Sequence, residues 1–117
     1  MVSRGTIILS TFPSEESVAD VAKKVVGSKL CACVNFTKIR SIYSWRGKVE
    51  DQQEFIALFK TTSKSTTKLK AEIARLHPYD VPEIVELKID DISNSYLSWL
   101  AESTDGVPKK RHDAAQR

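Results

Sequence analysis

The sequence predicts a single α+β domain with the element order β-α-β-β-α-β, followed by a C-terminal helix. Two observations carry this prediction. Residues 33–62 form two long strand-like stretches separated by a two-residue turn, and a segment with helical periodicity lies on each side of them. Short apolar strands at residues 6–11 and 83–89 complete the series. A chain of 117 residues carries one hydrophobic core.

Residues 6–11 are predicted to form a strand in which three consecutive apolar residues lie between short polar ones, a pattern that suits a central place in a sheet. A helix is predicted to follow, with Ser14 as its N-cap and with Glu15 and Glu16 in its first turn, where carboxylates favour the positive helix end. Gly27 is expected to end this helix in the left-handed conformation. Apolar residues at helical spacing form one stripe: Val18, Val21, Ala22, Val25 and Val26.

The central hairpin is the longest feature of the chain. Residues 33–45 and 48–62 are rich in β-branched and aromatic residues, and the intervening Arg46-Gly47 favours a tight antiparallel turn. An arm of this length spans about 43 Å, whereas a compact chain of this size is about 35 Å across. The hairpin should therefore either bend sharply or project beyond its domain. Lys38 interrupts one apolar face, so we expect a bend or bulge near Thr37-Lys38.

Both faces of the second arm are apolar. Phe55, Ala57 and Phe59 lie on one face, and Ile56 and Leu58 lie on the other. A hairpin with one wet face would alternate apolar with polar residues. We interpret the pattern as a hairpin covered by helices on one face and by neighbouring subunits on the other, and an ordinary buried central hairpin is the alternative.

A second helix is predicted after the hydroxyl-rich residues 61–67, where Ser65 or Thr66 can cap it. Its apolar positions are Leu69, Ile73 and Leu76. Pro78 ends this helix and leaves His77 in its last turn. A strand over residues 83–89 and a helix opened by Asn94 or Ser95 follow. This order is the ferredoxin-like split βαβ arrangement, a sandwich of four strands and two helices.

Composition adds further expectations. Apolar residues at 41% and charged residues at 28% are typical of a globular domain, which we assign to residues 1–104. Much of the net charge of +3 comes from residues 105–117, predicted to be a disordered basic tail, so nucleic-acid binding is not expected. No apolar run is long enough to cross a membrane. Cys31 and Cys33 are too poorly placed for a disulfide, which favours a reducing, cytoplasmic location.

The first candidate site is a metal site. A cysteine thiolate and a histidine imidazole suit copper or zinc, which makes Cys33 and His77 candidate ligands, with help from Glu83 or another subunit. Two alternatives stay open: Cys33 as a small buried hydrophobe, and His77 as a cap at the negative end of its helix. Phosphate-loop, zinc-finger and activated-nucleophile patterns are missing from the sequence, so a non-enzymatic protein is expected.

The second candidate site is a cleft where subunits meet. Polar and aromatic residues of the hairpin interrupt its apolar faces, and Tyr79 follows in the proline-stiffened loop. Charges beside an apolar seam are costly unless they are paired or meet a ligand. Intersubunit ion pairs, or an anion or metal pocket, are the two interpretations. The predicted cleft residues are Tyr43, Trp45, Glu54, Lys60 and Tyr79.

Several motifs together resemble the CutA divalent-cation tolerance family, over residues 6–100. They are Ala32-Cys-Val-Asn35, Ser41-Ile-Tyr-Ser-Trp-Arg-Gly47, Glu54, Lys60-Thr61 and His77-Pro-Tyr-Asp-Val-Pro-Glu-Ile84. The resemblance implies a tight homotrimer whose hairpins lend strands to their neighbours. It also implies a role in tolerance of copper and other divalent ions. Cys33 and His77 stand at motif positions proposed to meet metal, whereas Cys31 has no family role.

Two hypotheses follow. The first is a trimeric, non-enzymatic protein that binds divalent metal ions, copper foremost, in metal homeostasis, without an obligatory cofactor. The second draws on the likeness of such trimers to nucleotide-sensing PII signalling proteins. It is a signalling or scaffold trimer that binds a small anion or a partner protein in the intersubunit cleft.

Overall fold

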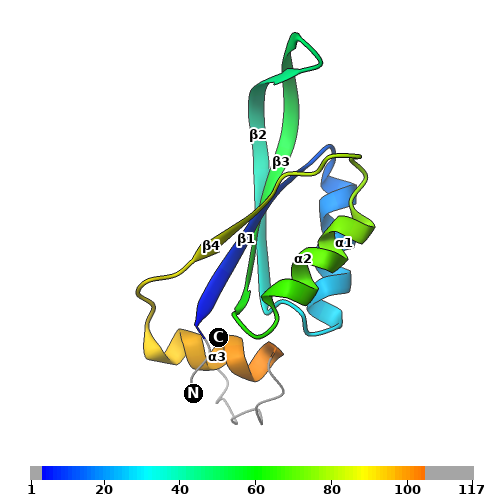
Figure 1. Ribbon diagram of the computed structural model, residues 1–117. Coiled ribbons are helices and arrows are strands. Elements are labelled where there is room, and N and C mark those ends of the chain that lie inside the picture. The colour runs from blue at the N-terminus through cyan, green and yellow to red at the C-terminus, as the bar shows by residue number, and fades with distance from the viewer. Residues whose placement is uncertain (1–3, 105–117) are drawn as a thin grey trace.

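The computed structural model describes residues 4–104, and its elements follow the predicted order (Figure 1). The predicted basic tail at residues 105–117 lies outside the described residues. The strands and helices are β1 (Gly5–Phe12), α1 (Glu15–Gly27), β2 (Cys33–Trp45), β3 (Lys48–Thr62), α2 (Thr66–Leu76), β4 (Ile84–Lys88) and α3 (Asn94–Thr104).

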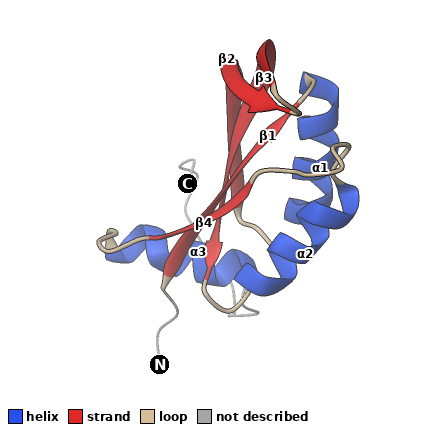
Figure 2. Cartoon of the chain, turned by 45° about the horizontal axis from the view of Figure 1, so that its top comes forward, coloured by secondary structure: helices blue, strands red, loops and turns tan. Residues whose placement is uncertain are grey.

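The strands form one antiparallel sheet in the order β2-β3-β1-β4. Helices α1 and α2 lie together on one face of this sheet (Figure 2). The predicted α+β sandwich is therefore confirmed. Among residues 4–104 no helix is long and apolar enough to cross a membrane.

The hairpin has the predicted bounds. Its register runs without interruption from Cys33 opposite Lys60 to Trp45 opposite Lys48, so the predicted bulge near Thr37-Lys38 is wrong. Arg46 and Gly47 both have positive φ, 50° and 77°, and a turn of this kind matches the natural twist of a hairpin. The ladder needs no bulge because Lys38 lies exposed on the edge strand, where a charged side chain costs little.

The hairpin also projects, as predicted. Strand β1 ends at Phe12, opposite Phe55, so the rest of the hairpin has no third strand beside it. The longest dimension of the molecule is 51 Å and its radius of gyration is 15.4 Å, above the ~13 Å of a compact chain of similar size. Figure 1 shows the two strands rising beyond the helices.

The main core lies between the sheet and the two helices. Helix α1 begins where Ser14 accepts a hydrogen bond from the backbone of Ser17, and it buries its predicted stripe except Val26, which is 39% exposed. The central side chains of this core are Ile8, Phe12, Val18, Val25, Phe59, Leu69 and Ile73.

The end of α1 differs from expectation. Gly27 is the last helical residue, and the left-handed conformation falls at Lys29 with φ 63°. The backbone N–H groups of Ser28 and Lys29 still bond to carbonyls of the last turn, those of Lys24 and Val26. The chain therefore reverses two residues later than predicted.

The opposite face of the sheet is also apolar. Val85 and Leu87 of β4 are 41% and 44% exposed, and the ladder aligns Val85 with Leu9 of β1 and Leu58 of β3. Helix α3 covers only part of the sheet, where Leu100 is fully buried outside the main core. The prediction that both faces of the hairpin sheet are apolar is confirmed.

The left-handed turn makes a stability prediction. Gly47→Ala should lower the free energy of unfolding by about 1 kcal/mol, since a Cβ is strained at positive φ. Gly27→Ala is the matched control, because Gly27 is helical and a Cβ there meets nothing within 4 Å. It should leave stability unchanged or raise it by up to about 1 kcal/mol. Urea denaturation at fixed protein concentration measures both, and equal effects would contradict the assignment.

Candidate functional site

A cleft of about 720 Å³ opens on the projecting hairpin. It lies where β1 ends and where the segment between α2 and β4 passes the hairpin (Figure 1). The hairpin supplies one wall and residues 78–83 supply the other. The lining residues are Thr11, Ser41, Ile42, Tyr43, Trp45, Glu54, Pro78, Tyr79, Asp80, Val81 and Glu83.

The cleft gathers four of the five predicted residues: Tyr43, Trp45, Glu54 and Tyr79. The Tyr79 hydroxyl donates a hydrogen bond of 2.7 Å to Oε2 of Glu54, whose side chain is buried at 6% exposure. Burial, and then the hydrogen bond to Glu54, raises the pKa of the Tyr79 phenol well above its usual value. The phenol therefore stays protonated and holds the buried carboxylate in place.

Lys60 does not line this cleft. It lies opposite Cys33 at the base of the hairpin, six residues along β3 from Glu54, which corresponds to about 20 Å of strand. The two side chains share a face of the sheet, as predicted, but not a site. The carboxylates of Glu54, Asp80 and Glu83 line the cleft, and no lysine or arginine of residues 4–104 does. Its charge therefore favours cations.

His77 is fixed at the inner edge of this region. Its Nε2 lies 2.9 Å from the carbonyl oxygen of Thr11, and the backbone N–H of Tyr79 donates to Nδ1 at 3.2 Å. The ring stacks on Phe12 with centroids 4.2 Å apart. Nδ1 accepts, so Nε2 carries the proton and donates to Thr11. Burial lowers the pKa of His77, opposed by the hydrogen bond to Thr11 and the charge of Glu54.

The structure corrects one interpretation of His77 and constrains another. His77 is the C-cap residue of α2 and has an extended backbone. Its ring, however, contacts the end of β1 and not the carbonyls of α2, so the interpretation of the imidazole as the capping group is wrong. Both ring nitrogens have partners, so a metal ion could bind only after one of those bonds opens.

The cysteines lie at the start of β2, far from the cleft along the strand. Neither cysteine takes part in a disulfide. Cys31 is buried with its Sγ near the carbonyl oxygens of Cys33 and Lys60, and burial raises the pKa of its thiol to about 12. Cys33 is half-buried, with its Sγ 3.6 Å from Oδ1 of Asn35.

The predicted metal ligands Cys33, His77 and Glu83 do not meet within one chain. In the part of the chain that the structure describes, no three His, Cys, Asp or Glu side chains gather as a metal site. Glu83 lies in the cleft, whereas Cys33 pairs with Lys60 at the other end of β3. A site that uses all three needs a second subunit, and this set stays a prediction.

Sequence reasoning missed Asp80 and the apolar walls formed by Ile42 and Val81. Asp80 lies between the two prolines that stiffen the loop, Pro78 and Pro82. Its place in the cleft depends on how the α2–β4 segment crosses the hairpin, a long-range contact with no local signal.

The sheet order, the overlong hairpin and the acidic, aromatic cleft define a hairpin-extended protein of the ferredoxin-like class. The family model for the CutA1 divalent ion tolerance protein matches residues 6–103. The chain belongs to this family.

Similar proteins match this chain over nearly their whole length. The divalent-cation tolerance protein CutA of Thermus thermophilus is 46% identical over 99 residues, 84% of this chain and 96% of the relative. A solved structure of the Thermus thermophilus protein superposes with a TM-score of 0.81 at 46% identity, over 86% of this chain and 98% of that one. The names of these relatives describe tolerance of divalent cations and specify no catalysed reaction.

One relative overturns the predicted location. A CutA from Archaeoglobus fulgidus, 33% identical with a TM-score of 0.82 over 85% of this chain and 97% of that one, is described as a periplasmic divalent cation tolerance protein. The prediction of a cytoplasmic location is therefore wrong. The physical basis of that prediction was weak, because two cysteines separated by one residue on a strand are poorly placed for a disulfide in any compartment.

The Tyr79–Glu54 hydrogen bond makes a second prediction. Tyr79→Phe should lower the free energy of unfolding by about 1–3 kcal/mol, because it leaves a buried carboxylate without its donor. Tyr43→Phe is the control, since Tyr43 is 40% exposed, and it should change stability by less than about 0.5 kcal/mol. Thermal or urea unfolding at neutral pH measures the difference, and similar losses in both variants would contradict this role for Tyr79.

Proposed function

We propose that this protein is a non-enzymatic homotrimer that binds divalent metal ions, copper foremost, and serves in metal-ion tolerance. The observation that carries the proposal is the charge of the cleft. Glu54, Asp80 and Glu83 line it without a lysine or arginine among residues 4–104. Such a site concentrates cations, which agrees with a family whose model describes divalent ion tolerance.

Glu83 is the ligand candidate that is most readily available. Its side chain is exposed, and it has no hydrogen bond or ion pair among the described residues. His77 becomes available when the bond from the Tyr79 N–H opens, and Cys33 contributes from a neighbouring subunit. Thiolate and imidazole donors together favour copper over harder ions such as magnesium.

The trimer is supported by surfaces that the single chain leaves uncovered. Exposed apolar side chains outside the cleft lie on β4 at Val85 and Leu87, and beside the hairpin turn at Val49. Within residues 4–104, no further strand pairs with the two edges of the sheet, β2 and β4. Association between copies buries such apolar surface and pairs open edges.

The alternative is a signalling or scaffold trimer. A small anion fits the cleft poorly, because carboxylates line it and the predicted cation, Lys60, lies elsewhere. A partner protein is the better version of this alternative, since Tyr43 and Trp45 are 40% and 42% exposed and aromatic residues are enriched at protein interfaces.

The metal proposal predicts the effect of removing ligands. Glu83→Gln and Cys33→Ser should each weaken copper affinity by at least about tenfold, as expected when a metal loses a donor. Glu50→Gln is the control, because Glu50 lies on the same strand as Glu54 but does not line the cleft. Competitive titration against a chelator of known affinity measures the change. Unchanged affinity in both ligand variants would remove these residues from the site.

The trimer proposal predicts that charged side chains on the sheet face opposite α1 and α2 prevent association of the subunits. Sedimentation equilibrium should give wild type a mass about three times that of the 13.1 kDa chain. The double variant Val85→Lys with Leu87→Lys should dissociate, because buried unpaired charges are costly. Val26→Lys is the matched control on α1, since Val26 is 39% exposed, and it should stay trimeric. A wild-type monomer at micromolar concentration would overturn the proposal.

A further inference from the structure

The cleft is larger than a metal ion requires. A water molecule occupies about 30 Å³, so an ion with six waters needs roughly 200 Å³, whereas the cleft measures about 720 Å³. Pockets of about 300–1,000 Å³ are typical of sites for small organic molecules. The volume therefore indicates an organic ligand, in addition to any ion.

The walls identify the charge of that ligand. Tyr43, Trp45 and Tyr79 line the cleft together with its carboxylates. The faces of aromatic rings attract cations within about 6 Å of the centroid. The Arg46 guanidinium lies over Trp45, 5.4 Å from the ring centroid, so a ligand cation must use the other face of this ring.

Glu54 supplies the specific feature. Its side chain is buried, with an exposed fraction of 6%, and it lines the cleft. It has one hydrogen bond among the described residues, to Oε2 from Tyr79, and its second oxygen has no donor. A carboxylate has about four acceptor sites, and the second oxygen keeps some solvent exposure, so it can accept a hydrogen bond from a ligand in the cleft. A ligand that brings both a positive charge and an N–H donor would satisfy it.

We propose that this cleft binds a protonated organic amine, an ammonium group attached to an apolar body. The ammonium group donates to Glu54 and lies against the rings of Tyr43 and Trp45. The apolar body contacts Ile42, Pro78 and Val81, which line the same cleft. The amine site shares the acidic cleft with the proposed metal site, but it uses neither Cys33 nor His77, so variants can test the two proposals separately.

Phenethylammonium is a suitable probe because it joins one ammonium group to one aromatic ring. Calorimetric titration of the full chain, with a chelator present to remove metal ions, compares it with two analogues of similar size. Phenethyl alcohol is neutral and phenylacetate is anionic. The ammonium compound should bind at least roughly tenfold more tightly than the alcohol. Its charge allows a charge-assisted hydrogen bond to Glu54 and a cation–π interaction with the aromatic rings of the cleft. Phenylacetate should not bind.

Variants then locate the site. Glu54→Gln should weaken phenethylammonium binding by at least roughly tenfold, and Trp45→Leu by roughly two- to fivefold. Trp45 is 42% exposed, so its replacement tests the cleft without disturbing the core. Glu50→Gln is the control for a nearby carboxylate outside the cleft and should bind as wild type does.

Two outcomes would overturn this inference: equal binding of the ammonium compound and the alcohol, or unchanged binding in both Glu54→Gln and Trp45→Leu. Cys33→Ser separates it from the metal proposal. That variant should lose copper affinity and keep phenethylammonium binding, so one proposal can fail while the other stands.

Discussion

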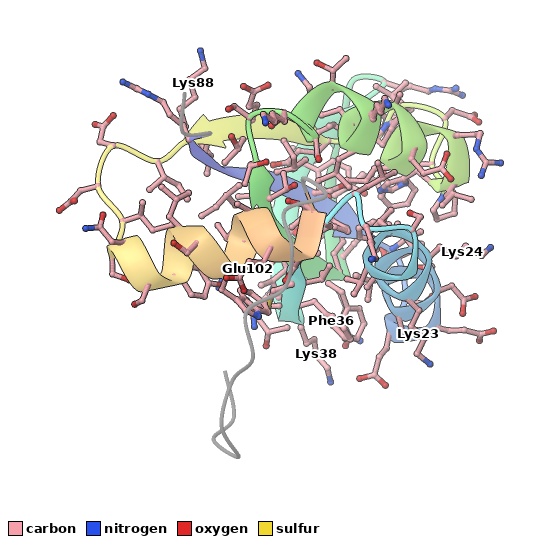
Figure 3. All side chains as sticks on the ribbon, turned by 90° about the horizontal axis from the view of Figure 1, so that it is seen from below. Lys23, Lys24, Phe36, Lys38, Lys88 and Glu102 are labelled. Carbon is pink, nitrogen blue, oxygen red and sulfur yellow. The ribbon has the colours of Figure 1, made fainter. Side chains whose placement is uncertain are left out.

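The unbroken antiparallel ladder between β2 and β3 is the constraint on which the rest of the structure depends. It is longer than the strand beside it, since β1 ends at Phe12 while the hairpin continues to Trp45. This mismatch frees the end of the hairpin from the sheet, and the α2–β4 segment passes over the place where β1 stops. The cleft exists because that segment and the hairpin meet there without a strand between them. No lysine or arginine of residues 4–104 lines it. In Figure 3, Lys23, Lys24, Lys38 and Lys88 point outward from the molecule.

A small polar network holds the second wall of the cleft. His77 bonds to the end of β1 through Thr11 and to its own loop through the N–H of Tyr79, and Tyr79 bonds to Glu54 of the hairpin. Three parts of the chain are thus tied together through two aromatic side chains. Burial costs Glu54 its hydration, and the phenol returns only part of it. The same network that stabilises the loop leaves a carboxylate that can attract a cation.

Local patterns predicted the fold well. The hairpin bounds and the α1 cap at Ser14 depend on residues close together in the sequence, and the strand arrangement follows from the β-α-β-β-α-β element order. The errors arose where the outcome depends on distant parts. A bulge near Lys38 was unnecessary once β2 became an edge strand, and the ring of His77 turned to β1 and not to its own helix. The structure brings Tyr43, Trp45 and Glu54, three of the residues predicted from the hairpin, together in the cleft. The sequence pattern could not exclude Lys60, which shares a face of the sheet with Glu54 but lies further along β3. It also could not place Asp80 on the opposite wall.

The edge strand β2 carries a further consequence for the behaviour of the protein in concentrated solution. Before subunits associate, it offers 13 residues of backbone that a foreign strand could extend, and Ile42 on it is 65% exposed in the single chain. Such an edge is a template for fibril growth. Lys38 and Arg40 lie exposed along it, and Arg40 is bound to Asp51 of the neighbouring strand by a bidentate ion pair. These two charges act as gatekeepers, so the strand that gives the molecule its reach also carries its own protection against uncontrolled polymerisation.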